Sequence, residues 1–371
     1  MWATRTMREL ALLFLRLGLT AFGGPAAHIA MMQREVVGRL GWLTEQEFLD
    51  SLSLASLIPG PSSTELAIHI GYRRAGWRGL VLAGVCFIMP AALMVGVLAW
   101  AYVRFGQLPR VAGVLWAVKP VVIVLVAEAV WKLSRTALKT RWLVAIALVC
   151  VALFAAQISP LLVLLAGAVL AMAPRVREAR VRLLVIGAAL PVGATKLGAW
   201  PIFFAFVRIG SVLFGSGYVL LAFLRAELVE RYHWLTSQQL LDAVAIGQVT
   251  PGPVFTTATF IGYVLMGTRG AVAATIGIFV PAFVFVAIGA IFLPRLRQSQ
   301  TFGAALNGVN AASLALMAVV TVQLGRAALT GWIPLSIALL SAVALWRFRV
   351  NSSWVILAAV VAGLLAGAHR F

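Results

Sequence analysis

Two copies of one short motif decide the fold: Ile58-Pro59-Gly60-Pro61-Ser62-Ser63-Thr64-Glu65 and Thr250-Pro251-Gly252-Pro253-Val254-Phe255-Thr256-Thr257. Proline removes a backbone N–H donor, clashes with the preceding helical turn and disfavours helical geometry in the residue before it. It is well suited to the start of a helix, because its missing donor would be unpaired there anyway. We therefore expect each motif to end one half-helix and to start another, whose free N–H groups and positive dipole end suit an anion.

The composition around these motifs is that of a membrane protein. Of 371 residues, 62% are hydrophobic and 11% are charged, and the mean hydropathy is +1.01. Such long apolar segments predict an all-α polytopic membrane protein in contact with membrane lipid. The net charge of +19 does not predict a nucleic-acid partner, because the arginines lie between apolar runs, as the cytoplasmic loops of a membrane protein require.

The chain contains two homologous halves. Trp42-Leu43-Thr44 matches Trp234-Leu235-Thr236 at an offset of 192, the offset that also relates the two Pro-Gly-Pro motifs. We predict a first repeat over residues 1–182, a linker or extra membrane segment over 183–200 and a second repeat over 201–371. Helices broken at matching positions are typical of transporters built as inverted repeats, with a site between the halves near mid-membrane.

The number of membrane crossings depends on the Pro-Gly-Pro segment. A re-entrant hairpin gives each half about five spans, whereas a broken helix that crosses gives about six. The distribution of arginines favours the crossing, with about thirteen spans in total, the N-terminus inside and the C-terminus outside. We therefore expect about ten to thirteen transmembrane segments.

Arg16 and Arg208 are the strongest candidates for substrate binding. They are repeat mates inside apolar spans, each shortly before a glycine-containing interruption. A charge at membrane depth is functional by default, and the planar guanidinium suits an oxyanion. The alternative is that both side chains extend to the membrane interface.

Small and polar residues near the interruptions are further candidates for substrate binding. Glycines there allow close backbone approach, although helix packing explains them equally well. Hydroxyl groups there can donate to an anion, and capping the new half-helix is compatible with that role. Lys119 lies before Pro120 within a span, where a buried cation can form part of a site. The complete set of these candidates is Gly23, Gly24, Ser62, Ser63, Thr64, Lys119, Gly215, Gly217, Thr256 and Thr257.

Three carboxylates are candidates for proton coupling: Glu65, Asp50 and Asp242. Glu65 has Thr257 as its repeat mate, and an acidic residue is also favoured at a helix start for electrostatic reasons alone. Asp50 and Asp242 are mates, for which a structural cap or an Arg partner is the alternative.

Two other pairs of residues receive a structural interpretation. Glu35 and Glu227 lie near Arg39 and Arg231, which favours interfacial ion pairs. His28 and His69 are expected to be hydrogen-bonded polar residues, because no second His or Cys has ligand spacing. The sequence therefore predicts neither a metal site nor a cofactor.

The chain resembles the chromate ion transporter family in its two-domain long form. The resemblance rests on paired motifs over most of the chain: Phe22-Gly23-Gly24-Pro25, Trp42-Leu43, Pro59-Gly60-Pro61, Gly71, Gly76, Gly79, Pro90, Lys119-Pro120, Phe214-Gly215-Ser216-Gly217, Trp234-Leu235-Thr236, Gln248, Pro251-Gly252-Pro253, Gly262-Tyr263, Gly267, Gly270 and Pro281. The resemblance implies export of chromate from the bacterial cytoplasm across the inner membrane and chromate resistance, with sulfate as a chemically similar anion.

The resemblance also adds a site residue and leaves some properties open. The family often has Gln shortly before the first Pro-Gly-Pro; here Ser56 stands in that position, whereas the second half keeps Gln248, which becomes a further substrate candidate. Antiport with protons and a homodimer remain open.

Membrane potential alone can drive the export of a dianion. Moving two negative charges out of a negative-inside cell gains about 4.6 kcal/mol per 100 mV, and the sequence carries no P-loop motif for ATP. Two rival interpretations remain, a transporter of another oxyanion such as sulfate and an intramembrane lipid-pyrophosphate phosphatase. The phosphatase is less favoured, because Ser62-Ser63-Thr64 has no adjacent Arg and no acidic metal site is evident.

Overall fold

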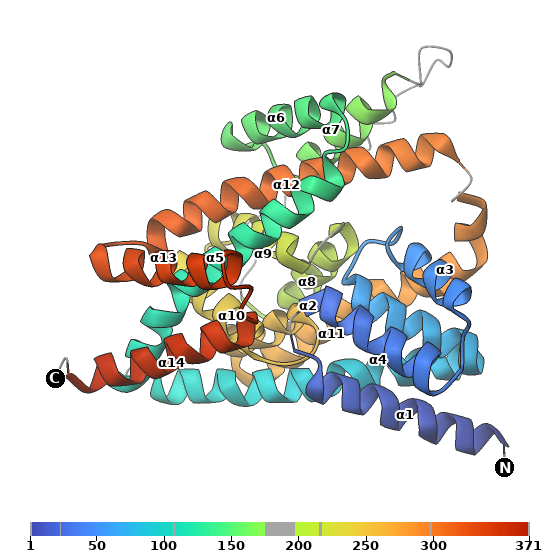
Figure 1. Cartoon of the computed structure of the whole chain (residues 1–371), viewed down its shortest axis with the longest axis horizontal. Helices are drawn as coiled ribbons and strands as arrows, with labels where there is room; N and C mark the ends of the chain where they lie inside the picture. Colours follow the sequence, from blue (N-terminus) through green and yellow to red (C-terminus); the bar gives the residue numbers. More distant parts are fainter. Residues whose placement is uncertain are drawn as a thin grey trace.

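The protein is all-α, as the sequence predicts. The computed structural model describes residues 2–22, 24–106, 108–174, 197–214, 217–296 and 299–369, and within these ranges it contains helices but no strand (Figure 1). Four described helical segments are long and apolar enough to cross a membrane: Ser62–Phe105, Pro109–Ala137, Val254–Gly289 and Gln300–Ala328. These are α4 (Ser62–Phe105), α5 (Pro109–Ala137), the greater part of α11 (Thr257–Leu296) and α12 (Gln300–Ala328).

The other elements are shorter. In the first half they are α1 (Trp2–Thr20), α2 (Gly24–Gln33), the π-helix η1 (Arg34–Arg39), α3 (Glu45–Ala55), α6 (Arg141–Ala155) and α7 (Pro160–Met172). In the second half they are α8 (Ala199–Val212), η3 (Gly217–Val219), α9 (Leu220–Leu224), the π-helix η4 (Arg225–Arg231), α10 (Ser237–Val249), η5 (Val254–Thr256), α13 (Trp332–Trp346) and α14 (Ser352–His369).

The two halves are intertwined. Within each half the first helix packs on the long helix, α1 on α4 and α8 on α11, and α4 and α11 also pack on each other. The last helix of each half crosses to the other half, so that α7 packs on α12 and α14 packs on α5. Glycines let these backbones approach closely: a Cβ placed on Gly363 of α14 would lie 2.6 Å from the carbonyl oxygen of Gly113 on α5. The described part of the chain therefore forms one body around a shared core.

Within the first third of helices α4 and α11 the chain reverses direction. Ala75 and Gly76 have non-helical backbone angles, with φ of +59° at Gly76, and Met266 and Gly267 repeat them with φ of +60° at Gly267. After this reversal Gly71 packs against Gly79, where a Cβ on either residue would collide with the carbonyl oxygen of the other. Each of the two long helices is therefore a half-helix followed by a full-length helix.

The first Pro-Gly-Pro motif is the tip of a re-entrant hairpin. Glu47 near the start of α3 forms an ion pair of 2.9 Å with Arg73 at the end of the half-helix that follows the motif. Both ends of the segment therefore lie on the same side. The 11 residues of α3 rise only about 16 Å, which is too short to cross the hydrocarbon core. The re-entrant alternative thus fits the structure, and the broken helix that crosses the membrane, which the arginine distribution favours, is wrong for this segment.

Capping interactions fix where α3 and α10 begin. Thr44 accepts a hydrogen bond from the backbone N–H of Glu47, and the Glu47 carboxylate accepts one from the N–H of Thr44. Thr236 and Gln239 make the same reciprocal pair at α10. The capping box at Thr44 sets the start of α3, and its copy at Thr236 starts the equivalent helix in the second half.

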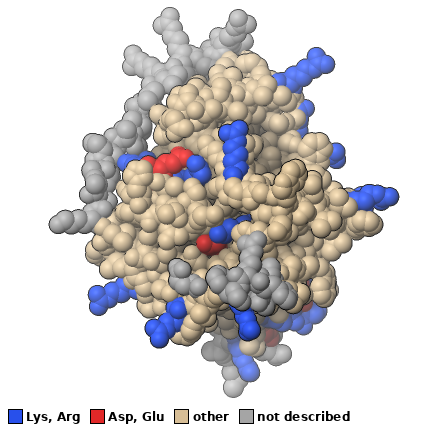
Figure 2. All heavy atoms as spheres, turned by 90° about the vertical axis from the view of Figure 1, so that its left-hand side faces the viewer, with Lys and Arg blue, Asp and Glu red and all other residues tan. Residues whose placement is uncertain are grey.

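The outside of the protein suits a lipid environment. Large apolar side chains are exposed along α4, α6, α11, α13 and α14, for example Leu93, Leu148, Ile276, Leu340 and Leu365. Figure 2 shows one face on which uncharged residues predominate, with Lys and Arg projecting at the margins and also lying beside acidic groups nearer the middle. Such a surface is stable in contact with acyl chains and not in water.

Candidate functional site

The helix interruptions of the two halves bond to each other in reciprocal pairs. The backbone N–H of Gly60 donates to the carbonyl oxygen of Leu213 at 2.6 Å, and the N–H of Gly252 donates to that of Ala21 at 2.9 Å. Gly252 is the repeat mate of Gly60, and Leu213 is the mate of Ala21, so each contact is the symmetry copy of the other. Each Pro-Gly-Pro tip is thereby held against the first interruption of the opposite half.

Two further contacts connect the interruptions within each half. His28 on α2 donates from Nε2 to the carbonyl oxygen of Ala21 at 3.0 Å, while its Nδ1 lies 3.3 Å from Oγ of Ser63 on α4. In the second half, a Cβ on Gly217 would lie 3.7 Å from the Cβ of Val254, so these segments are also in contact. The described parts of the interruptions, at residues 21–22 and 24, 56–61, 213–214 and 217, and 250–253, thus meet in one place, which we call the junction.

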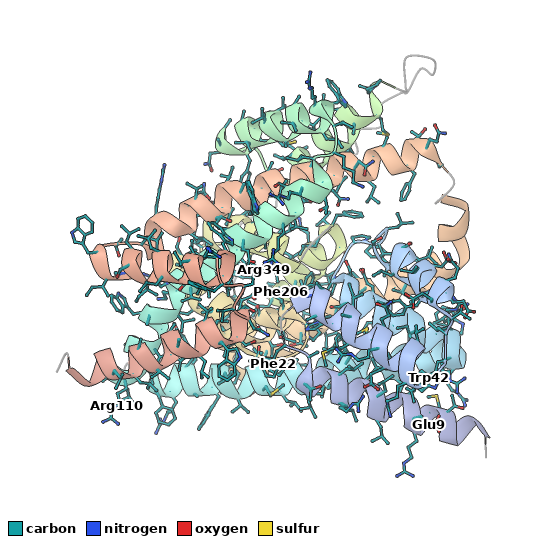
Figure 3. The ribbon with its side chains drawn as sticks, viewed as in Figure 1. Glu9, Phe22, Trp42, Arg110, Phe206 and Arg349 are labelled. Atoms are coloured by element: carbon teal, nitrogen blue, oxygen red, sulfur yellow. The ribbon has the colours of Figure 1, made fainter. Side chains whose placement is uncertain are left out.

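Three helices begin at the junction. They are α2 at Gly24, α4 at Ser62 and α11 at Thr257. The N–H groups of a first helical turn have no partner within the helix, and the positive end of the helix dipole lies with them. The junction therefore gathers backbone donors of the type that binds anions. Figure 3 places Phe22, at the first interruption, in the middle of the molecule, and Glu9 and Trp42 at one end.

The predicted hydroxyl ligands have different surroundings in the two halves. Thr256 donates to the carbonyl oxygen of Pro253 and Thr257 to that of Val254, both at 2.8 Å, so they cap their own turn. In the first half Ser63 lies beside His28, whereas the buried Oγ1 of Thr64 has no hydrogen-bond partner within the described structure. The first-half tip is therefore the side with polar groups available for a ligand.

Glu65 lies on the same turn of α4. Its side chain is fully buried, and neither carboxylate oxygen has a hydrogen-bond partner among the described residues. The carboxylate lies against the tip, because a Cβ placed on Gly60 would collide with Oε1 of Glu65. With φ of +140° and this close neighbour, the position of Gly60 accepts only glycine without rearrangement.

Arg16 and Arg208 lie in matching charge clusters. Arg16 pairs with Glu35, which also pairs with Arg39 at 2.5 Å. The mates of these three residues repeat the cluster: Arg208 lies 3.6 Å and Arg231 3.2 Å from the carboxylate of Glu227. The predicted ion pairs of the two glutamates with Arg39 and Arg231 are confirmed, and each cluster additionally contains the predicted substrate arginine. Two arginines share one carboxylate in each cluster, which leaves a net charge of +1.

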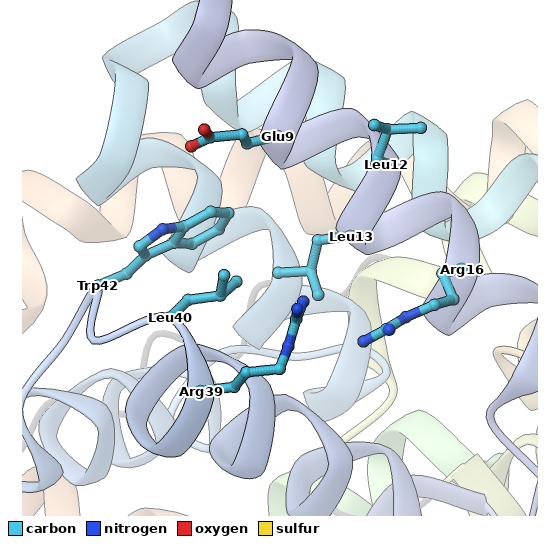
Figure 4. A pocket seen from close by; sticks show the side chains of 7 residues that line it. All are labelled: Glu9, Leu12, Leu13, Arg16, Arg39, Leu40 and Trp42. Atoms are coloured by element: carbon cyan, nitrogen blue, oxygen red, sulfur yellow. The ribbon is translucent and has the colours of Figure 1, made fainter.

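The first of these clusters borders a pocket of about 310 Å³ (Figure 4). Its walls are Glu9, Leu12, Leu13 and Arg16 of α1 together with Arg39, Leu40 and Trp42. In the close-up the side chains of Arg16 and Arg39 extend toward each other across the pocket. Arg16 lies five residues before Ala21, which is about 7.5 Å along the helix axis. The pocket and the junction are therefore neighbours along α1.

Lys119 and Asp242 form a buried ion pair between the halves. Nζ of Lys119 on α5 lies 2.9 Å from Oδ1 of Asp242 on α10, and it donates to Oε1 of Gln238 at 2.8 Å. The hydroxyl of Tyr102 donates to Oδ2 of Asp242 at 3.0 Å. Lys119 was predicted as a substrate ligand and Asp242 as a proton carrier, and the structure joins them to each other. The pair connects the first half to α10, the helix that directly precedes the second Pro-Gly-Pro motif.

The remaining predicted site residues occupy different settings. Gly24, with φ of +77°, starts α2, and Gly217 packs against Val254 at the junction. Gln248 is half-buried near the end of α10, three residues before Pro251. Asp50 is half-buried on α3, where the side-chain amide of Gln46 donates to it at 3.4 Å. Gly23 and Gly215 lie outside the described residues.

Some functional contacts could not be found from the sequence. The carbonyl groups of Ala21 and Leu213 accept the two reciprocal bonds, and any residue carries such a group. Tyr102 becomes part of the ion-pair network only through tertiary packing. The exact offset between the interruptions was the one available signal, because repeat mates in an inverted pair must occupy symmetric places.

Comparison with known proteins identifies the family. The sequence model of the chromate transporter family matches residues 8–172 and again residues 200–364. The chain is 33% identical to the chromate transport protein of Cupriavidus metallidurans, over 98% of this chain and 94% of that protein. It is also 33% identical to the chromate transport protein of Pseudomonas aeruginosa, over 95% of this chain and 90% of that protein.

A shorter relative matches about a third of the chain. The uncharacterized transporter YwrA of Bacillus subtilis is 34% identical over 138 residues, which are 37% of this chain and 78% of that protein. No solved structure matches the chain. The two family matches and the near full-length relatives show that the chain belongs to the chromate transporter family.

Proposed function

We propose that the protein exports chromate from the bacterial cytoplasm across the inner membrane and thereby confers chromate resistance. The oxyanion binds at the junction, between the two halves. Its ligands there are the backbone N–H groups and hydroxyls at the starts of α2, α4 and α11, including Ser62, Ser63 and Thr64. The relatives are named transport proteins, which supports transport rather than phosphatase chemistry.

The observation that carries this proposal is the reciprocal bonding of the interruptions. Gly60 and Gly252 each bond to the opposite half, so a movement of one half relative to the other changes both contacts at once. A site at the contact between two inverted halves can open to either side of a membrane when the halves rock. The site and the moving parts of the protein are then the same residues.

The charge clusters supply attraction for the anion. The clusters around Glu35 and Glu227 each keep a net charge of +1, and Arg16 is half exposed on the wall of a pocket. A positive charge beside an access route raises the local concentration of an anion. We propose that Arg16 and Arg208 bind the oxyanion as it approaches or leaves the junction, one in each half.

Membrane potential drives the export. A dianion that leaves a negative-inside cell without a co-transported ion gains about 4.6 kcal/mol per 100 mV, so no ATP site is needed. The test is uptake of labelled chromate into everted inner-membrane vesicles, with the interior potential set positive or to zero. We expect accumulation only under the positive interior potential. Absence of accumulation under every gradient contradicts chromate transport.

Sulfate is the second candidate substrate. Backbone N–H donors and arginines recognise the shape and charge of a tetrahedral dianion, and both anions have these properties. Excess sulfate in the same vesicles distinguishes the two. If sulfate reduces chromate uptake and is itself accumulated, the site accepts both oxyanions. If sulfate has no effect at a hundredfold excess, the site selects chromate.

A further inference from the structure

Glu65 is the one residue of the first tip whose chemistry does not fit an anion site in its charged form. It is fully buried beside Gly60, and its oxygens have no hydrogen-bond partner within the described structure. A carboxylate in this position would repel an oxyanion bound to the first turn of α4. An unpaired charge on a fully buried side chain is also strongly unfavourable, so in this conformation the group is stable only with a proton.

No nearby charge offsets this. The elements packed on α4 are α1, α2, α3, α10, α11 and η5. The charged and histidine side chains described on these elements and on α4 itself, apart from Glu65, are Arg8, Glu9, Arg16, His28, Glu45, Glu47, Asp50, His69, Arg73, Arg74, Arg78, Arg104, Asp242 and Arg269. Among the described residues none of these bonds to Glu65. His28, which lies 3.3 Å from Ser63 on the same turn of α4, is hydrogen-bonded to the carbonyl oxygen of Ala21.

The second half shows that the position does not require a carboxylate for folding. Thr257 is the repeat mate of Glu65, and its hydroxyl caps its own turn through Val254 at 2.8 Å. A small neutral residue therefore occupies the equivalent position in the second half. We infer that the Glu65 carboxylate in the first half is not needed for folding.

We propose that Glu65 carries a proton across the membrane together with the oxyanion, in the same direction. This inference rests on the proposed function. A proton from water binds the Glu65 carboxylate as the oxyanion binds the adjacent N–H groups, and both are released when the site opens to the other side. Binding of the proton removes the negative charge that repels the oxyanion, so the two bind cooperatively. Exchange of a proton for the oxyanion would instead require that binding of the proton weakens binding of the oxyanion.

The direction of coupling can be measured in proteoliposomes of the purified full-length protein. The membrane potential is held at zero, and a difference of one pH unit is imposed with equal chromate on both sides. One-to-one coupling in the same direction concentrates chromate about tenfold on the alkaline side. Proton exchange concentrates it on the acidic side and overturns the proposal.

Glu65→Gln identifies which group carries the proton. This variant imitates the protonated carboxyl and cannot release a proton, so we expect its chromate to equilibrate without a gradient. Accumulation on the alkaline side that persists in Glu65→Gln would assign the proton to the anion itself and overturn the role of Glu65. Glu128→Gln is the matched control and should behave as the unchanged protein. Glu128 lies on α5, where it pairs with Lys132 of the same helix.

An infrared measurement tests Glu65 without transport. The spectrum of the unchanged protein saturated with chromate at neutral pH, minus that of Glu65→Gln under the same conditions, should contain the carbonyl band of a protonated carboxyl group in an apolar environment. A difference spectrum with carboxylate bands alone contradicts the proposal. If chromate flux is absent from all samples, the function proposed above fails, and the infrared result still decides the state of Glu65.

Discussion

The backbone N–H of Gly60 donates to the carbonyl oxygen of Leu213 across the contact between the two halves. The same bond recurs between their repeat mates, Gly252 and Ala21. Two hairpin tips therefore depend on each other's position, and a change at either tip should affect both transport and stability.

Gly60→Ala should destabilise the protein and reduce transport. Its φ of +140° is strained for any other residue, and the added Cβ would collide with Glu65. Strain of this type costs about 1–3 kcal/mol. The midpoint of thermal unfolding in detergent and chromate uptake by vesicles measure the two effects. Gly38→Ala is the control, because a Cβ there meets nothing within 4 Å; equal midpoints for both variants would refute the close packing at the tip.

Arg16→Gln should abolish chromate transport in protein that remains folded. The substitution removes the guanidinium from the cluster with Glu35 and leaves that carboxylate to Arg39 alone, so the net charge of +1 is lost. Arg208→Gln should have the same effect through its matching cluster. Vesicle uptake and size-exclusion profiles provide the measurement, with the exposed Arg104→Gln as control. Unchanged uptake in Arg16→Gln would show that this arginine does not handle the substrate.

The ion pair of Lys119 and Asp242 should contribute to the association of the halves. Lys119→Met or Asp242→Asn alone leaves a buried group without its partner, which costs about 3–5 kcal/mol. The double variant should be less destabilised than the sum of the single variants. Unfolding free energies of the three proteins form the cycle. Additive losses would show that the two side chains act independently.

Gly71→Val should disrupt the reversal within α4. Any Cβ at this position collides with the carbonyl oxygen of Gly79, so the half-helix cannot pack on the helix that follows. Gly96→Val on the same element carries the same change in helix propensity, but a Cβ there meets nothing within 4 Å. We expect poor yield and early unfolding only for Gly71→Val. Comparable stability of the two variants would contradict the tight hairpin.

Removal of the proton carrier should steepen the response to membrane potential. A dianion with one proton has a net charge of −1 and gains about 2.3 kcal/mol per 100 mV, which is about fiftyfold accumulation. In Glu65→Gln the dianion moves alone and gains about 4.6 kcal/mol, on the order of a two-thousandfold ratio. Chromate ratios at 100 mV, with equal pH on both sides, distinguish the two. Equal ratios would show that Glu65 does not change the transported charge.

The sequence determined the membrane class, the two halves and the places where helices break. Segments this apolar lie in lipid, where backbone N–H and C=O groups must hydrogen-bond within the segment, so they form helices. Pro-Gly-Pro cannot continue a helix. These conclusions therefore depend on local chemistry alone. The pairing of Glu35 with Arg39 and the capping of α3 by Thr44 were predictable for the same reason, because both partners lie within one turn.

Only the tertiary structure decided what the breaks contact. The ion pair of Glu47 with Arg73 makes the first motif a re-entrant hairpin, and the partners are 26 residues apart. The bond from Gly60 to Leu213 and the pair of Lys119 with Asp242 join residues more than a hundred positions apart. Such contacts arise from how whole helices pack, and no local pattern encodes them. For that reason the sequence located the residues of the junction, and the packing of the two halves determined how they meet.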